Sequence, residues 1–287
     1  MANGGDDDMR NSAPMPERPL TVVAAIVWFL CATFGTLLLL VATRVLRPSS
    51  GTDLVNAVAC QAAAYSITVF LAVRYHADNS PLLSTLAFRK TDPWMYLLGL
   101  LLGVCMHVPA DLLQRLVFHF KPRSPEAVQL QIDILRMESP VSRFMIPIAV
   151  VILGPAVEEL LFRGVLYGGM RRCTSLPVSL FVASALFAGA HQDGLLFLPF
   201  LIVGGVITLL RAASGSLWPC LIAHAVFNAV PIVALASGWI QLTPEPDPMP
   251  LALSIGGVLA SALLVAVLLL LFRNSDAAAR ARSQDSV

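Results

Sequence analysis

The chain has 287 residues, of which 57% are hydrophobic and only 13% are charged, and its mean hydropathy is +0.76. Soluble domains carry about 25% charged residues, so this composition excludes an ordinary water-soluble domain and indicates a protein that spans a lipid bilayer. The formal net charge of +1 gives no sign of a nucleic-acid or acidic partner. The five cysteines lie singly in or beside apolar segments, which is typical of small buried hydrophobes rather than of disulfides or metal ligands.

Long apolar runs recur along almost the whole chain. A membrane-spanning helix needs about 20 mostly apolar residues. The runs that qualify are residues 20–43, 54–73, 94–115, 144–170, 175–191, 195–212, 217–237 and 249–272. The sequence therefore predicts an all-α, polytopic integral membrane protein with about eight transmembrane helices and without a second domain.

Polar segments flank and interrupt these runs. Residues 1–19 form a polar N-terminal tail and residues 273–287 a polar C-terminal tail, both expected to be disordered, which leaves 20–272 as the transmembrane domain. Residues 80–92 are expected to lie at the membrane interface. Residues 124–135, within the longest loop, begin with a helix-start signature and predict a short amphipathic helix at the surface.

The distribution of Lys and Arg predicts the orientation of the chain. Eleven of these residues fall on the side of the membrane that carries the N-terminus and seven on the other side, while Arg163 lies within a span. Cytoplasmic loops carry the excess of positive residues. Both termini are therefore expected in the cytoplasm, and the membrane is expected to be the cell (plasma) membrane.

Three charged residues lie where a bilayer disfavours them, in the run 144–170. Glu158, Glu159 and Arg163 fall within six residues, and a charge at mid-membrane costs about 3 kcal/mol on insertion scales. Glu159 and Arg163 share a helix face, four residues apart, and are expected to pair. Glu158 points about 100° away and has no cation on its own helix, an environment that favours the protonated carboxyl group. It suits general acid–base catalysis; the alternative is that both glutamates only pack and pair.

Two histidines and an asparagine lie in later spans. His191 follows Phe187 by one helical turn, and His224 stands four residues before Asn228 on the same helix face. With a rise of about 1.5 Å per residue, we expect four residues to lie about 15 to 24 Å from the membrane side that carries the N-terminus. These are Glu158, His191, His224 and Asn228. These residues therefore fall in one band of a hydrocarbon core that is about 30 Å thick. The alternative is that each histidine is a satisfied structural residue.

His107 lies at a similar depth in the run 94–115, with Asp111 four residues later. The spacing favours a hydrogen bond from His107 to Asp111 near the interface. A place for His107 in the polar band is the alternative interpretation.

Three motifs contain the polar residues of the later spans. They are EExxxR (Glu158, Glu159, Arg163), FxxxH (Phe187, His191) and HxxxN (His224, Asn228). In this order on transmembrane helices, over about residues 145–235, they resemble the CAAX prenyl endopeptidase and bacteriocin-processing family of intramembrane proteases, also called the abortive-infection family. The first three helices carry no family signature.

The resemblance implies hydrolysis of a peptide bond within the membrane. The substrate would be a peptide or a membrane protein, and it is lipidated in the eukaryotic branch of the family. The resemblance assigns activation of the attacking water to Glu158 and His191, and stabilisation of the oxyanion to His224 and Asn228. It assigns support of the site to Glu159, Arg163 and Phe187, with Phe187 packed beneath His191.

The residues themselves agree with a water nucleophile. Ser184 has no evident partner, and Cys220 lies one turn before His224, so neither is a convincing nucleophile, and amide hydrolysis then needs an activated water. Glu158, His191 and His224 would supply three ligands to one zinc ion, the usual number in a catalytic site. The spacing is not HExxH, however, and the family has been described both as metalloproteases and as glutamate-dependent proteases. A metalloprotease and a glutamate-dependent protease therefore both stand as alternatives.

Two other functions compete with the peptidase. A proton- or metal-coupled transporter would use Glu158 and the histidines as a relay, but transporters often carry inverted repeats, and this sequence shows none. A non-catalytic membrane scaffold or immunity protein would keep the fold without turnover, although the intact motifs argue against degeneration. The sequence favours the intramembrane endopeptidase of the CAAX type.

Overall fold

The computed structural model describes residues 18–48, 53–77, 80–135, 137, 139–240, 243 and 249–284. In this part of the chain the regular structure is entirely helical, and seven helical segments are long and apolar enough to cross a membrane. The remaining predicted span forms α11 (Leu176–Ala190), an apolar helix of only 15 residues. The predicted all-α, polytopic membrane fold is confirmed.

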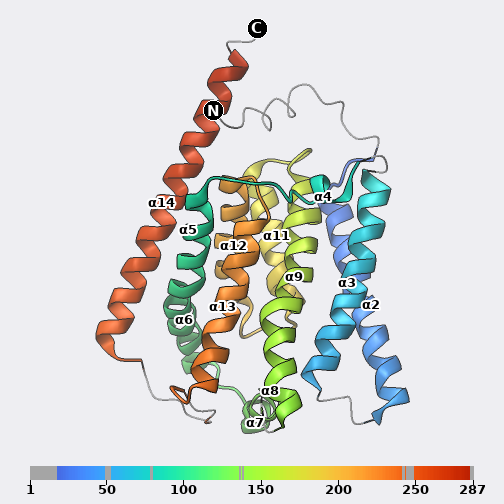
Figure 1. The fold of residues 1–287 in the computed structure, drawn as a ribbon, viewed down its shortest axis with the longest axis vertical. Helices are drawn as coiled ribbons and strands as arrows, with labels where there is room; N and C mark the ends of the chain where they lie inside the picture. Colours follow the sequence, from blue (N-terminus) through green and yellow to red (C-terminus); the bar gives the residue numbers. More distant parts are fainter. Residues whose placement is uncertain are drawn as a thin grey trace.

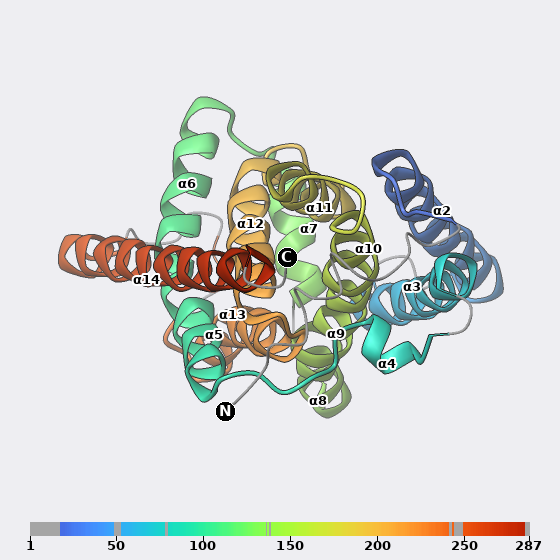
Figure 2. The same ribbon diagram turned by 90° about the horizontal axis from the view of Figure 1, so that it is seen from above.

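The long helices run alternately up and down through one bundle (Figure 1). Seen from above, α2 (Val22–Leu46) and α3 (Leu54–His76) form one edge, and α14 (Leu251–Gln284) forms the opposite edge (Figure 2). Between these edges stand α11, α12 (Phe197–Ser214) and α13 (Trp218–Ala236). The start of α2 and the end of α14 lie at the same end of the bundle, as an even number of crossings requires.

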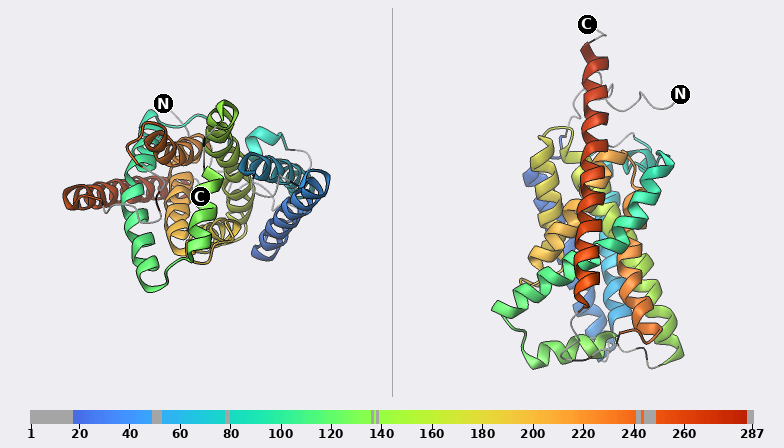
Figure 3. Two further views of the ribbon diagram at one scale, coloured as in Figure 1. Left: turned by 90° about the horizontal axis from the view of Figure 1, so that it is seen from below. Right: turned by 90° about the vertical axis from the view of Figure 1, so that its left-hand side faces the viewer.

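The span predicted at 94–115 is two helices rather than one. These are α5 (Pro93–Cys105) and α6 (His107–Phe120), which meet at Met106. Figure 2 shows α6 turning away from the direction of α5. The predicted surface helix then follows as α7 (Pro125–Leu135), which lies across the lower end of the bundle (Figure 3).

The span that carries the charged residues is irregular along its length. It consists of α8 (Pro140–Pro147), the π-helix η2 (Ile148–Leu153), α9 (Gly154–Glu159), the π-helix η3 (Leu160–Tyr167) and α10 (Gly168–Met170). Pro155 has no N–H, and its ring clashes with the carbonyl one turn earlier, so the helix must widen or bend there. In η2 the Gly154 N–H reaches five residues back, to the Ala149 carbonyl. Glu158 and Glu159 therefore lie between two π-helical segments, which are frequent at functional sites.

Three proline residues free backbone carbonyls, and each carbonyl is bound by a side chain from another helix. Ser261 Oγ donates to Cys105 O at 2.8 Å, four residues before Pro109. Asn228 Nδ2 donates to Val150 O at 2.9 Å, five residues before Pro155 in the π register. His107 Nε2 donates to Phe227 O, four residues before Pro231. A buried carbonyl without a partner is costly, so these contacts fix how the interrupted helices pack together.

Two glycines of α5 allow α13 to approach at backbone distance. A Cβ atom added at Gly99 would lie 2.6 Å from Pro219 O, and one at Gly103 would lie 2.6 Å from Ala223 O. Small residues with this spacing are typical of close helix packing in membranes. The contact positions α13, and with it the neighbouring His224.

The polar segments differ in part from their predicted form. Residues 273–284, expected to be a disordered tail, continue α14 as helix to Gln284, and Figure 1 shows this end projecting beyond the bundle. Residues 80–92 contain the one-turn helix α4 (Leu82–Thr85). Most of the predicted N-terminal tail, residues 1–17, lies outside the described residues.

Candidate active site

The predicted ion pair between Glu159 and Arg163 forms in the interior of the bundle. Arg163 Nη1 lies 2.8 Å from Glu159 Oε1, and both side chains are 0% exposed. Arg163 also donates to Thr208 Oγ1 at 3.2 Å and to Gly204 O at 2.9 Å, both on α12. Its guanidinium carbon lies 4.4 Å from the centre of the Phe187 ring. The buried cation is therefore satisfied by three helical segments, as an intramembrane charge requires.

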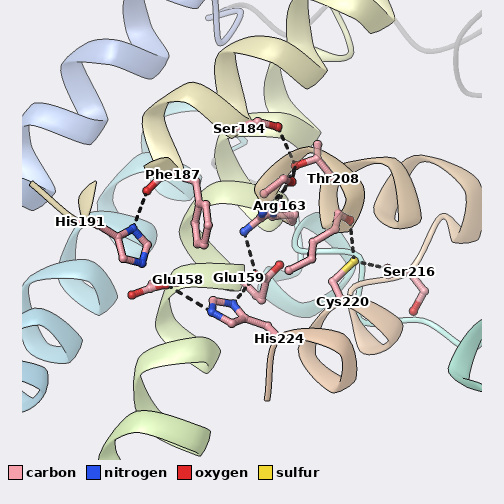
Figure 4. Close-up of polar contacts among 12 residues, drawn as sticks. Glu158, Glu159, Arg163, Ser184, Phe187, His191, Thr208, Ser216, Cys220 and His224 are labelled. Carbon is pink, nitrogen blue, oxygen red and sulfur yellow. Dashed lines mark hydrogen bonds and ion pairs between the residues drawn. The ribbon is translucent and has the colours of Figure 1, made fainter. Parts of the chain in front are cut away.

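His224 joins this pair from α13. Its Nδ1 lies 2.8 Å from Glu159 Oε1, and its Nε2 lies 3.7 Å from Glu158 Oε2 (Figure 4). A carboxylate only accepts, so Nδ1 carries the proton in the bond to Glu159. Within the described part of the chain, Glu159 Oε2 is buried without a hydrogen-bond partner. His224 thus bridges the two adjacent glutamates and turns Nε2 toward Glu158.

Glu158 occupies a more open position than Glu159. Its side chain is 12% exposed, and no Lys or Arg of the described residues pairs with it. Its Oε1 accepts a hydrogen bond from Gln61 Nε2 on α3 at 3.0 Å. Sequence reasoning missed Gln61, which is separated from Glu158 by 97 positions. The available signal was a carboxamide inside the apolar run 54–73.

His191 lies directly after the end of α11. Its Nδ1 bonds Phe187 O at 3.0 Å, its ring stacks on Phe200 at 3.8 Å, and the Phe187 ring packs edge-on at 5.0 Å. A backbone carbonyl only accepts, so Nδ1 is the protonated nitrogen, and Nε2 of the neutral ring keeps its lone pair. Figure 4 shows His191 and Glu158 directed toward one another. The Phe187 ring also meets His224 edge-on at 5.6 Å and so separates the two imidazoles.

Asn228 lies one turn beyond His224 and does not join the cluster through a direct contact. Its carboxamide donates instead to Val150 O of η2 at 2.9 Å. This bond uses one of the two amide hydrogens and leaves the other. The structure thus brings Glu158, Glu159, His191 and His224 together, while Asn228 is bound to η2.

The hydrogen bond expected between His107 and Asp111 does not form. His107 bonds Phe227 O and stacks on the Phe227 ring at 4.1 Å, while Asp111 pairs with Arg115 at 2.7 Å. Pro231 has no N–H to bind the Phe227 carbonyl, so this carbonyl accepts a hydrogen bond from the His107 imidazole instead. Asp111 pairs with Arg115, one helical turn away. His107 holds α6 against α13 and does not belong to the cluster.

The two rejected nucleophiles are engaged with backbone carbonyls. Ser184 Oγ donates to Leu180 O at 2.7 Å, and Cys220 Sγ donates to Ile207 O at 3.5 Å. Neither side chain has a base in hydrogen-bond contact, which nucleophilic activation needs. A water nucleophile remains the better fit to these contacts.

The three side chains predicted as possible zinc ligands are Glu158, His191 and His224. No group of three His, Cys, Asp or Glu side chains in the described ranges is placed to hold a metal ion. Glu158, His191 and His224 surround one region without forming such a group, and Glu159, the carboxylate nearest His224, is bonded to Arg163. In these positions the three side chains do not form the three-ligand group that a catalytic zinc ion takes.

Part of the chain matches a known family. Residues 140–230 match a family described as type II CAAX prenyl endopeptidase Rce1-like. Neither the curated proteins nor the solved structures provide a match to the chain. The matched residues run from the start of α8 into α13 and contain all three motifs. The resemblance inferred from the motifs is confirmed: within a polytopic membrane protein, residues 140–230 are similar to the Rce1-like family.

Proposed function

We propose that this protein is an intramembrane endopeptidase of the CAAX type that uses a water molecule activated by Glu158 and His191. The observation that carries the proposal is the convergence of these two side chains with His224 inside a segment that matches the Rce1-like family. General bases must lie within hydrogen-bond reach of the proton they take, directly or through one water. Two acceptors directed at one region satisfy this requirement.

In the proposed reaction, the water oxygen attacks the carbonyl carbon of the scissile peptide bond. One water proton passes to Glu158, with the His191 Nε2 lone pair holding the water in place. The negative charge moves to the carbonyl oxygen. When the tetrahedral intermediate collapses, the C–N bond breaks and the proton held by Glu158 passes to the leaving amine. The products are a carboxylic acid and an amine, so atoms and protons balance.

His224 and Asn228 are proposed as the donors to the oxyanion. Since Nδ1 of His224 already donates to Glu159, Nε2 can donate only from the doubly protonated ring. Glu159 Oε1 lies 2.8 Å from Nδ1, and Glu158 Oε2 lies 3.7 Å from Nε2. Asn228 retains one amide hydrogen beyond its bond to Val150. Donors fixed before the reaction contribute the most to stabilising a developing oxyanion.

The proposed substrate is a peptide or membrane protein that reaches the bundle from the bilayer. Glu158 and His224 lie on helical segments long and apolar enough to span a membrane, so the scissile bond has to enter among those helices. By similarity to CAAX peptidases, we propose that the substrate is lipidated near the cleaved bond.

The decisive experiment is cleavage of quenched fluorescent peptides by the purified protein in detergent, with lipidated and unlipidated peptides side by side. We expect the wild type to cleave and Glu158→Ala and His191→Ala to lose cleavage while remaining folded. Glu126→Ala and His119→Ala, which change exposed residues of α7 and α6, are the matched controls and should retain activity. A chelator should leave the rate unchanged.

Three outcomes would contradict parts of this proposal. A folded wild type that cleaves no peptide would favour the scaffold interpretation. Ion or solute uptake that is lost in Glu158→Ala, without any cleavage, would favour a transporter. Cleavage that a chelator abolishes and zinc restores would show that a metal ion takes part.

A further inference from the structure

Gln61, which lies outside the segment that matches the Rce1-like family, binds the oxygen of Glu158 that does not face His224. Gln61 Nε2 donates to Glu158 Oε1 at 3.0 Å, while His224 Nε2 faces Oε2 at 3.7 Å. The family match begins at residue 140, so α3 and Gln61 lie outside it. The two oxygens of Glu158 are thus distinguished by their partners, one on α3 and one on α13.

The backbone around this contact is closely packed. A Cβ atom added at Gly154 would meet Val58 Cγ1 at 3.8 Å, which is ordinary van der Waals contact between α9 and α3. One turn after Gln61, the buried Tyr65 packs edge-on against Phe162 with ring centres 6.2 Å apart. Packing on both sides of Gln61 restricts the movement of α3 relative to α9 and η3. The carboxamide is therefore carried on a rigid element, which is what accurate positioning of another side chain requires.

We infer that Gln61 is a positioning residue for Glu158, and this inference rests on the proposed peptidase function. A glutamate side chain has three rotatable bonds, and a charged partner such as Arg163 would fix it but would also hold its negative charge. A neutral amide fixes the plane of the carboxylate through Oε1 and leaves Oε2 directed toward the region shared with the histidines. Gln61 thereby orients the base while allowing it to take and release a proton.

The test compares Gln61→Met, which keeps the side-chain length but removes the donor, with Gln61→Glu, which replaces the donor by a second carboxylate. We expect Gln61→Met to lower kcat about 10-fold with little change in KM, since a hydrogen bond to a charged group is lost and no substrate contact is removed. We expect Gln61→Glu to lower kcat further, because two carboxylates repel. Asn56→Leu is the matched control: Asn56 is also an α3 amide, but it donates to Thr43 Oγ1 at 3.1 Å, away from Glu158.

A second measurement does not depend on peptidase activity. The thermal unfolding temperature of Gln61→Met is compared in the wild-type chain and in a Glu158→Ala chain. If the two residues contact each other, the loss of Tm caused by Gln61→Met should be clearly smaller when Glu158 is already absent. Asn56→Leu should lower Tm equally in both chains.

The outcomes separate this inference from the proposed function. An active wild type with unchanged kcat in Gln61→Met, or additive Tm losses, would overturn the positioning role. An equal fall of kcat in Gln61→Met and Asn56→Leu would also overturn it, since a general loosening of α3 would then explain the effect. A coupled Tm cycle without cleavage in any sample would instead reject the peptidase function, and with it the catalytic purpose of the contact.

Discussion

The adjacent carboxylates Glu158 and Glu159 of α9 have contrasting surroundings. Glu159 is 0% exposed and bonds both Arg163 and His224, whereas Glu158 is 12% exposed and meets a neutral amide. Removing one partner of a buried ion pair is costly, whereas the hydrogen-bond partner of Glu158 is a neutral amide. The comparison indicates that the Glu159 side maintains the structure and that the Glu158 side carries the proposed chemistry.

The largest expected effect separates the two glutamates directly. Glu158→Gln should lower kcat by about 10²- to 10⁴-fold, the range for a general base, and should change the free energy of unfolding by less than about 1 kcal/mol. Glu159→Gln should lower the unfolding temperature as well as activity, since it weakens the bonds to Arg163 and His224. Peptide cleavage and thermal unfolding in detergent measure both quantities. Equal losses of stability in the two variants would remove the distinction.

Arg163→Met should have the next largest effect, and the effect is on stability. Removing one partner of a buried ion pair costs about 3–5 kcal/mol, because the other charge stays buried without compensation. The Glu159→Gln/Arg163→Met double variant should recover part of this loss, as measured by thermal unfolding. A double variant whose loss equals the sum of the two single losses would show that the pair is not the reason for the cost.

Gly204→Ala should disturb the Glu159 side by closing the space between α12 and Phe187 of α11. The added Cβ would lie 2.7 Å from Phe187 Cδ1 and 3.4 Å from Arg163 Nη2, and overpacking of this kind costs about 1–3 kcal/mol. Gly205→Ala is the matched control, since its nearest atom would be Ser184 Oγ at 3.9 Å. The control should be neutral or stabilising by up to about 1 kcal/mol, because alanine favours helix over glycine. Similar unfolding temperatures for both variants would contradict the close approach.

The smallest expected effect concerns the support of α13, which carries His224 and Asn228. His107→Leu should cost about 1–2 kcal/mol, since the Phe227 carbonyl loses its donor. In a Pro231→Ala chain the backbone N–H of residue 231 can bind that carbonyl, so the cost of His107→Leu should shrink. Unfolding temperatures of the four chains form the cycle, and an unchanged cost in the Pro231→Ala chain would argue against the freed carbonyl as the reason for the contact.

The sequence predicted which polar residues lie close together better than it predicted the shapes of the helices. The pairing of Glu159 with Arg163 follows from a separation of four residues on one helix, and the common depth of Glu158, His191 and His224 follows from the rise per residue. The break at Met106 and the π-helical turns around Pro155 were not predicted. Proline allows a kink, a break or a widened turn, and neighbouring helices decide which of these forms.

Hydrophobic length and the cost of burying charge were enough to determine the membrane-spanning class, the number of apolar runs and the charged cluster, because both properties belong to the sequence alone. Only the tertiary structure decided that Gln61 meets Glu158, that His107 binds Phe227 O rather than Asp111, and that Asn228 reaches Val150 O. Each of these contacts joins residues from different helices. Its partner is set by helix packing and by the carbonyls that proline leaves free, and neither can be read from spacing along one helix.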